Sequence, residues 1–445
     1  MKLIGKLKTK SASEIGHTRV GVGFEGLDRE LYRPECCYDL AAATGAQLVR
    51  TQSGWIRCET ERGVYSFDWL DEIVDSLISR GMKPWFNVGY GHPMYMKDIK
   101  STAAVGCVPF YFGDEALDAW KSYVKAMAEH FRGRVTHFEI WNEPDLGAFW
   151  YPKRPDPVKY AELISLTGSI IRSVIPDAKI GGCCSQSRPE YLYALFSALK
   201  PEEIDFFCPH NYDRYPERSV RTQRIRLLRL MLDELGFDNT VLWMGECGHA
   251  SWHPVGHSQC REGGGNEHRQ AVWHLRRYFL DLAEGYEMTS IYVVADNWER
   301  TYQTATFTEK KPAAQGILNG LTYTPKKSHE VMGYAAVALS GDCRLSGPVA
   351  LVDSRESDEE AVTVSYTRNG HPVMAYWLGT AVEREEQSES CSLIRSPLVK
   401  LSDPVLIDTY TGEVYEPDPT LTSLPLREYP ILLTERDCFE IIPNT

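Results

Sequence analysis

The sequence lacks the features that mark several classes of protein. It has no uncharged apolar run of 18 residues, so it predicts no membrane-spanning helix and no membrane partner. It has no tract rich in Lys and Arg, and its 61 acidic residues outnumber its 48 basic ones, which argues against a nucleic-acid partner. The first ten residues alternate Lys with small apolar residues and form no apolar signal-peptide core, so we expect a cytoplasmic protein.

Cysteine is also scarce, with twelve thiols in a chain of 445 residues. None of them forms a CxxC pair, and four stand as the adjacent pairs Cys36-Cys37 and Cys183-Cys184. A small scaffold held by disulfides would need a denser and more regular pattern. The pattern therefore favours reduced thiols.

The length of 445 residues predicts two or three domains, and most of the chain repeats a strand followed by a helix. The clearest helix is 67–80, where Leu70, Ile73, Val74 and Leu77 form one apolar face, with Ser66 as the expected cap. Further helices are expected at 117–131, 157–174, 220–235 and 267–283. The expected strands are 19–24, 47–52, 83–88, 135–141, 178–181, 205–209, 241–244 and 290–294. Eight such units predict a (β/α)8 barrel over residues 15–339.

The pattern changes after residue 339. Short alternating strands at 361–367, 372–378 and 405–409 are separated by turn residues, with no helical period. We therefore expect an accessory β-sandwich domain over residues 340–445. Residues 1–10, within the segment 1–14, are strand-like and are expected to add an edge strand to it and to bury Leu3 and Leu7. The short junction at 340–348 predicts that the domain is fixed to the barrel.

Reactive residues of such barrels lie at the carboxyl ends of the strands, and two strand ends carry glutamates. The fourth expected strand runs into HFEIWNEPD (137–145), which holds Glu143, and the seventh runs into VLWMGECG (241–248), which holds Glu246. Two carboxylates that converge at one barrel mouth are what cleavage of a glycosidic bond requires, one as acid and one as nucleophile. The nucleophile must stay ionised beside a cation, and Arg50 at the end of the second strand is the candidate.

These motifs resemble a known family. FEIWNEPDL (138–146), followed by Phe149-Trp150, resembles the acid/base signature of retaining glycoside hydrolases of clan A, most of all family 39, the β-xylosidase and α-L-iduronidase family. GECG (245–248) stands where the clan has its nucleophile, and HNY (210–212) resembles the clan's His-x-Tyr. DNWE (296–299) resembles the family's Asp-x-x-Glu segment.

The resemblance implies a role for each residue. Glu143 is the expected acid/base and Glu246 the expected nucleophile, which Tyr212 and Arg50 hold. Further residues are expected to bind the substrate, either from the resemblance or from their place near the mouth. Asn142 is expected to bind the sugar 2-hydroxyl, and His210 to act as a hydrogen-bond partner. Trp298 and Trp150 are expected as aromatic platforms, and Glu299 and His92 as ligands of other hydroxyls.

The expected activity is that of a retaining exo-β-glycosidase that releases a terminal sugar from an oligosaccharide or glycoside, without a cofactor. A β-xyloside is the first choice of substrate. β-Glucosides, β-galactosides, α-L-arabinosides and uronides stay open, as do a homo-oligomeric state and a non-catalytic carbohydrate-binding relative.

Two other motifs suggest different chemistry. GVGFEG (21–26) fits the dinucleotide fingerprint of an oxidoreductase, but Pro34 interrupts the helix that should follow, and no acidic residue stands about 20 residues on. Five potential zinc ligands also cluster in the chain, but Pro254 and Gly256 break any helix between them, which favours a substrate-lining loop without metal. These five ligands are Cys247, His249, His253, His257 and Cys260.

Overall fold

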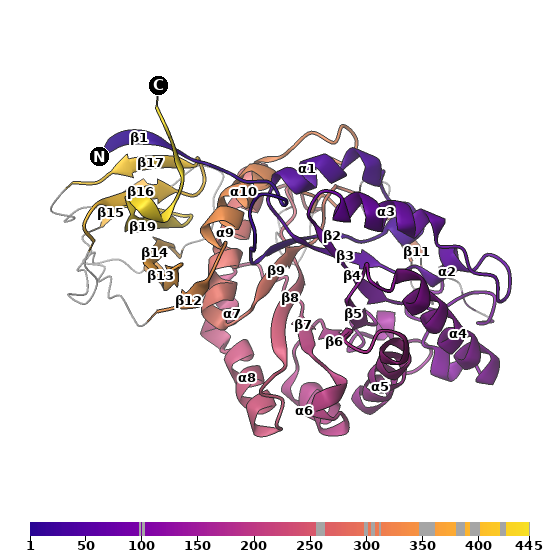
Figure 1. Ribbon diagram of the computed structural model, residues 1–445. Helices are drawn as coiled ribbons and strands as arrows, with labels where there is room; N and C mark the ends of the chain where they lie inside the picture. The colour runs from indigo at the N-terminus through magenta and orange to yellow at the C-terminus, as the bar shows by residue number, and fades with distance from the viewer. Residues whose placement is uncertain are drawn as a thin grey trace.

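The computed structural model describes residues 1–97, 99, 103–254, 263–297, 313–346, 361–379, 401–418 and 424–444, and the backbone of 301–303, 308–310 and 388–391. Eight parallel strands close into a barrel in chain order, which confirms the predicted (β/α)8 architecture (Figure 1). The strands are β2 (Val20–Phe24), β3 (Leu48–Gln52), β4 (Lys83–Val88), β5 (His137–Ile140), β6 (Lys179–Cys184), β7 (Phe206–Pro209), β8 (Val241–Cys247) and β9 (Met288–Ile291).

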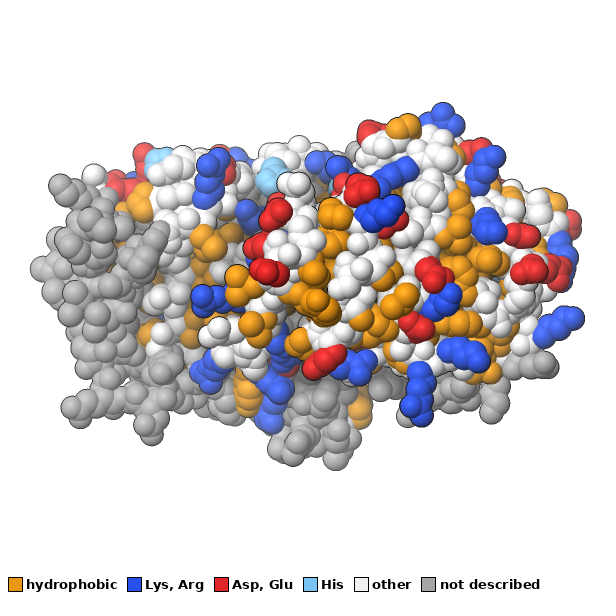
Figure 2. All heavy atoms as spheres, turned by 90° about the horizontal axis from the view of Figure 1, so that it is seen from below, with side chains coloured by type: hydrophobic (Ala, Val, Ile, Leu, Met, Phe, Trp, Pro, Cys, Tyr) orange, Lys and Arg blue, Asp and Glu red, His pale blue; other side chains and the backbone are white. Residues whose placement is uncertain are grey.

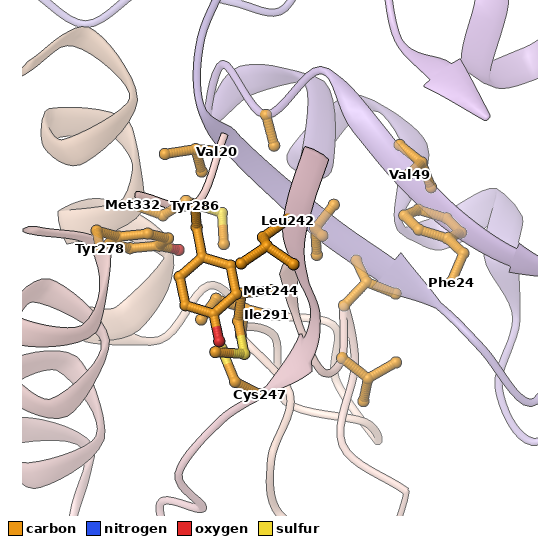
Figure 3. Packing of buried hydrophobic residues seen from close by; sticks show 14 of the residues in the cluster. Val20, Phe24, Val49, Leu242, Met244, Cys247, Tyr278, Tyr286, Ile291 and Met332 are labelled. Carbon is orange, nitrogen blue, oxygen red and sulfur yellow. The ribbon is translucent and has the colours of Figure 1, made fainter. Parts of the chain in front are cut away.

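Strand alternation divides the barrel into two cores. Inside the barrel, a small cluster consists of Trp85, Cys183, Phe206, Cys208, Trp243 and Met288. The residues between them face outward and pack under the helices. Figure 3 shows Val20, Leu242 and Ile291 of the strands facing Tyr278 of α9 (Glu267–Glu284) and Met332 of α10 (Lys327–Ala338).

The long helices agree with the sequence pattern, with two corrections. α3 (Asp68–Ile78) begins after Phe67, which makes no side-chain cap bond, so the expected Ser66 cap is wrong. The expected helix 220–235 is two helices, α7 (Glu217–Thr222) and α8 (Arg224–Glu234), because Gln223 adopts a left-handed conformation with φ of 52°. The remaining helices are α1 (Tyr38–Ala43), α2 (Trp55–Cys58), α4 (Asp114–Phe131), α5 (Pro157–Val174) and α6 (Pro189–Ala198).

Shorter elements complete the barrel part of the chain. The last barrel strand is β9 at 288–291, so the predicted range 290–294 is displaced toward the C-terminus. A two-stranded ribbon pairs β10 (Thr301–Gln303) with β11 (Thr308–Lys310). 3-10 turns lie at Leu27–Arg29, Pro34–Cys36, Pro109–Tyr111, Gly147–Phe149 and Pro201–Glu203, and one more follows later in the chain at Arg436–Cys438.

The C-terminal part is antiparallel, as predicted. Its main sheet has the order β12 (Cys343–Leu345), β13 (Ala361–Arg368), β14 (His371–Leu378), β19 (Ile431–Glu435), β16 (Pro404–Asp408), β17 (Glu413–Glu416), β1 (Lys2–Leu7) and β20 (Ile441–Pro443). A second pair joins β15 (Ser388–Cys391) to β18 (Leu424–Arg427). The N-terminal strand β1 joins this sheet as predicted, but it lies between β17 and β20 and not at an edge. Leu7 is buried as expected, whereas Leu3 is 40% exposed, contrary to the prediction.

The helix α9 lies between the barrel and this sheet and is buried along residues 270–282 (Figure 1). Arg276 of α9 donates from Nε to the Glu428 carbonyl at 2.6 Å and from Nη2 to the Leu378 carbonyl at 2.8 Å. Trp377 Nε1 donates to a carboxylate oxygen of Glu217 at 2.9 Å. Buried polar contacts of this kind fix one domain against the other, because each group left unpaired would cost free energy.

Among the described residues, no helix is both long enough and apolar enough to cross a membrane. The ten described cysteines are free thiols, and nine of them are buried. Seen from below, the surface mixes apolar, basic and acidic side chains (Figure 2).

Candidate active site

Arg50 on β3 is the centre of a buried network inside the barrel mouth. Its side chain is 0% exposed. Nη1 donates to Glu246 Oε2 at 2.7 Å and to Glu25 Oε1 at 3.2 Å. Nε donates to Glu139 Oε2 at 3.2 Å, and Nη2 donates to the other Glu139 oxygen and to Asn142 Oδ1, the latter at 2.9 Å. One guanidinium thus binds three carboxyl groups and one amide, which fixes all four side chains relative to one another.

Glu246 lies on β8, which extends three residues beyond the predicted end of that strand, at Met244. Tyr212, which follows β7, donates its hydroxyl to Glu246 Oε1 at 2.6 Å. Burial and the charge of Glu246 raise the pKa of Tyr212 well above its ordinary value, so its hydroxyl stays a donor at neutral pH. Each carboxylate oxygen of Glu246 therefore accepts a hydrogen bond from a described residue, and both of these bonds favour the ionised form.

Glu143 faces Glu246 across the mouth. A carboxylate oxygen of Glu143, one of Glu246 and a ring nitrogen of His210 all lie within 4.8 Å of one another. His210 Nδ1 lies 3.1 Å from Glu143 Oε1 and 3.9 Å from Glu246 Oε2. Burial lowers the pKa of His210, but the charge of Glu246 and the hydrogen bond to Glu143 outweigh it and raise the pKa. The two glutamate side chains are 11% and 14% exposed, whereas His210 is 0% exposed, so the glutamates are the groups that a substrate can reach.

The chain turns sharply before Glu143. β5 ends at Ile140, and both Trp141 and Glu143 have positive φ angles, 68° and 43°. Continued strand alternation would place Trp141 on the same face as Glu139. The turn instead directs Trp141 outward, where its ring packs edge-on against Trp120 at 6.0 Å. The same turn brings both Asn142 and Glu143 to the mouth, as expected from the end of a strand.

Glu25 was not predicted as a site residue, although it directly follows β2. A Cβ on Gly23 would lie 1.8 Å from Glu25 Oε2, so the glycine leaves the space that this carboxyl group occupies. Burial raises the pKa of Glu25 to about 8, an effect that Arg50 opposes and the charge of Glu246 adds to. The motif GVGFEG thus accommodates the buried carboxyl group of Glu25. The signal in the sequence that could have identified Glu25 as a site residue is its position, as a charged residue directly after a barrel strand.

Two predicted substrate-binding residues lie in the protein interior. His92 Nε2 donates to the Glu59 carbonyl at 2.8 Å, and Nδ1 accepts from the Met94 amide at 3.1 Å, so both nitrogens are used within the protein. Trp150 is 0% exposed and packs edge-on against Trp141, so its ring is not a platform, contrary to the prediction. The other predicted platform and hydroxyl ligand, Trp298 and Glu299, lie outside the described residues.

The predicted cysteine and histidine cluster forms no common centre within the described residues. Cys247 lies on the outer face of β8, opposite Glu246, where its thiol donates to the Ser290 carbonyl at 3.5 Å (Figure 3). The rings of His249 and His253 are 4.8 Å apart. The other two members, His257 and Cys260, lie outside the described residues.

The described groups whose ligand atoms meet are Glu139, Cys183 and His210, and Glu143, His210 and Glu246. Arg50 contacts a carboxylate of each group and already supplies a positive charge, which disfavours a metal ion there.

A closed (β/α)8 barrel with two facing glutamates at the carboxyl ends of its strands is an architecture typical of glycoside hydrolases. Residues 47–227 match the family model described as Glycosyl hydrolases family 39. This segment includes Arg50, Glu143 and Tyr212. The match confirms the resemblance to glycoside hydrolase family 39.

Individual relatives agree with this match. The chain is 27% identical over 164 residues to a β-xylosidase of Geobacillus stearothermophilus, covering 33% of this chain and 31% of the relative. It is 23% identical over 189 residues to a β-xylosidase of Caldicellulosiruptor saccharolyticus, covering 38% of this chain and 37% of that relative. The aligned part thus spans about a third of the curated relatives it matches. The structure of a family 39 β-xylosidase from Caulobacter crescentus superposes with a TM-score of 0.59 over 96% of this chain and 97% of that one, at 16% identity, which supports the shared fold.

Proposed function

We propose that this protein is a retaining exo-β-glycosidase that releases a terminal sugar through a covalent glycosyl-enzyme intermediate. The observation that carries the proposal is the approach of Glu143 and Glu246, since one carboxylate oxygen of each lies within 4.8 Å of the other. Retaining enzymes hold their two carboxyl groups about 5 to 5.5 Å apart, whereas inverting enzymes leave about 6.5 to 9.5 Å for a water molecule. The short separation favours direct attack by one carboxylate.

In this proposal Glu246 is the nucleophile. The hydrogen bonds from Tyr212 at 2.6 Å and Arg50 at 2.7 Å stabilise its negative charge and orient it toward the anomeric carbon. Both donors keep their protons at neutral pH, because the pKa values of Arg50 and Tyr212 are both raised well above their ordinary values. Glu246 thus remains ionised while the substrate is bound.

Glu143 is the acid/base in the same proposal. It gives its proton to the leaving oxygen as the bond to Glu246 forms, and it takes a proton from water when the glycosyl-enzyme is hydrolysed. His210, at 3.1 Å from Glu143, orients the carboxyl group. Asn142 accepts from Arg50 through Oδ1, so the amide presents Nδ2 to the sugar 2-hydroxyl, a contact that strengthens in the transition state.

A β-xyloside is the first choice of substrate, because the curated relatives that match are β-xylosidases. We assign the chemistry to a catalytic barrel at 15–339 and propose that 340–445, with β1, forms an accessory domain. Exo action on short glycans is part of the proposal. β-Glucosides, β-galactosides, α-L-arabinosides and uronides are the alternatives on the same machinery.

The test is turnover of a panel of 4-nitrophenyl glycosides by the wild type and by three alanine variants. Glu246→Ala should abolish turnover, and azide should restore it with an inverted glycosyl azide product. Glu143→Ala should still release nitrophenol in a first burst and then stall. Glu115→Ala, at an exposed glutamate on α4, is the control and should behave as wild type. Exchanged phenotypes would reverse the two roles, and no turnover of any glycoside by the wild type would instead favour a carbohydrate-binding protein.

A further inference from the structure

The acid/base residue stands on an unusual backbone turn. Trp141 and Glu143 both adopt left-handed conformations, with φ of 68° and 43°, although neither is glycine. Each such residue costs about 1 to 3 kcal/mol and persists only where the surrounding structure holds it. The position of the Glu143 carboxyl group therefore depends on the contacts that hold residues 141–143.

A single thiol bridges this turn. Cys183 lies on β6, the strand next to β5 in the barrel, with its side chain fully buried inside. The backbone N–H of Glu143 donates to Cys183 Sγ at 3.2 Å, and the Cys183 thiol donates to the Trp141 carbonyl at 3.5 Å. The side chain amide of Asn87 donates to the same carbonyl at 2.5 Å. Cys183 thus contacts the first and the last residue of the turn.

The thiol can make both contacts only while it keeps its proton. Burial, together with the charge of Glu139, raises the pKa of Cys183 well above its ordinary value, so it remains a thiol at neutral pH. Cys208, on the neighbouring strand β7, belongs to the same buried cluster inside the barrel. No hydrogen bond joins Cys208 to residues 141–143 among the described contacts, which makes it a matched comparison.

We propose that Cys183 is a positioning residue for the acid/base step, holding the backbone of Glu143 so that its carboxyl group meets the leaving oxygen and, later, the attacking water. The inference rests on the proposed function, in which Glu143 is the acid/base. Without the thiol, the turn at 141–143 loses two of its hydrogen bonds and relaxes. A displacement of about 1 Å at a reacting group can cost about a hundredfold in rate.

The kinetic test compares Cys183→Ala, Cys183→Ser and Cys208→Ala in the full chain on aryl β-xylosides, or on the aryl glycosides of whichever sugar the wild type prefers. In Cys183→Ala, kcat/KM for a phenyl glycoside should fall about 10- to 100-fold. For a 2,4-dinitrophenyl glycoside it should change little, since that leaving group needs no acid. Azide should raise kcat for the dinitrophenyl substrate, because azide needs no general base.

The other variants separate positioning from packing. Cys183→Ser keeps a donor and acceptor and should show a smaller difference between the two substrates than Cys183→Ala. Cys208→Ala removes the same volume from the same core and should change both substrates alike. If Cys183→Ala also changed both substrates alike, or neither, the positioning role would be refuted.

A second measurement does not depend on turnover. Hydrogen–deuterium exchange of the peptide that contains residues 141–146 should be about tenfold faster in Cys183→Ala than in wild type, because the Glu143 amide loses its acceptor. In Cys208→Ala the same peptide should exchange as in wild type. Equal exchange in the two variants would overturn the inference even if the wild type hydrolysed no glycoside, whereas that failure alone would contradict only the proposed function.

Discussion

Replacing Tyr212 by Phe removes the hydrogen bond that its hydroxyl donates to Glu246 and leaves the one from Arg50 in place. The lost bond is 2.6 Å long and joins a buried hydroxyl to a carboxylate. Hydrogen bonds to charged groups contribute about 1.5 to 3 kcal/mol, so kcat/KM should fall about 10- to 150-fold. Because the bond favours the ionised form of Glu246, its loss lets the carboxylate take up a proton more easily. The acidic limb of the pH profile should therefore move to higher pH by about one to two units.

The assay is kcat/KM for a nitrophenyl glycoside from pH 4 to pH 9, for the wild type and two Tyr→Phe variants. Tyr286→Phe is the control, because Tyr286 is buried away from the barrel mouth and its hydroxyl has no hydrogen-bond partner among the described residues. It should keep both the rate and the position of the acidic limb. If Tyr212→Phe also kept both, Tyr212 would not orient the nucleophile, and the reasoning on Glu246 would be wrong.

Three further predictions concern stability. Arg276→Met removes two buried hydrogen bonds to carbonyls of the β-domain, so urea unfolding should show a free energy of unfolding lower by about 3 to 6 kcal/mol. Arg344→Met, at an exposed arginine, is the control and should lower it by less than about 0.5 kcal/mol. Equal losses in the two variants would contradict a fixed interface. The pKa of Glu25 is about 8 in the folded protein, against its ordinary value of 4.5, so between these two pH values only the folded state holds the Glu25 proton. The contribution of Glu25 to the free energy of unfolding therefore falls by about 1.4 kcal/mol for each pH unit from pH 4.5 to pH 8. Glu25→Gln has no such proton to lose, so its melting temperature should rise relative to that of the wild type as the pH increases from 5 to 8. A difference in melting temperature that stayed constant over this range would refute the raised pKa of Glu25. Truncation of the chain after Leu339 removes the β-domain and exposes α9, so the remaining barrel should be less soluble or have a lower melting temperature. If the barrel alone stayed stable and fully active, the β-domain would be independent of it.

The barrel could be predicted because its pattern is local. The apolar strand 83–88 and the helix 157–174 have the observed bounds, since β-branched runs and the helical period need only neighbouring residues. The break at Gln223 was missed, because the residues around it continue the helical pattern and tertiary packing decides where the helix ends. The displacement of the last barrel strand has the same cause: pairing with β2 and β8 sets its bounds.

The site could be predicted in part for a similar reason. Residues at the carboxyl ends of parallel strands meet in space, so Arg50, Glu143 and Glu246 could be expected to lie together. The sequence could not show that Glu25 folds back over a glycine, or that the Cys183 thiol contacts the turn before Glu143. Both depend on side-chain directions within a crowded interior. The sequence also could not assign roles to the aromatic residues near the mouth, because composition does not distinguish a buried ring from a sugar platform.

The measurement that tests the central claim most directly is the stereochemistry of the first product. Proton NMR during the first minutes of hydrolysis of a 4-nitrophenyl β-glycoside, the β-xyloside first, identifies the anomer before mutarotation mixes the two. Attack by Glu246 followed by attack of water inverts the anomeric carbon twice, so the β-anomer should appear first. If the α-anomer appeared first, water would attack the substrate directly, and the role of Glu246 as nucleophile would be contradicted.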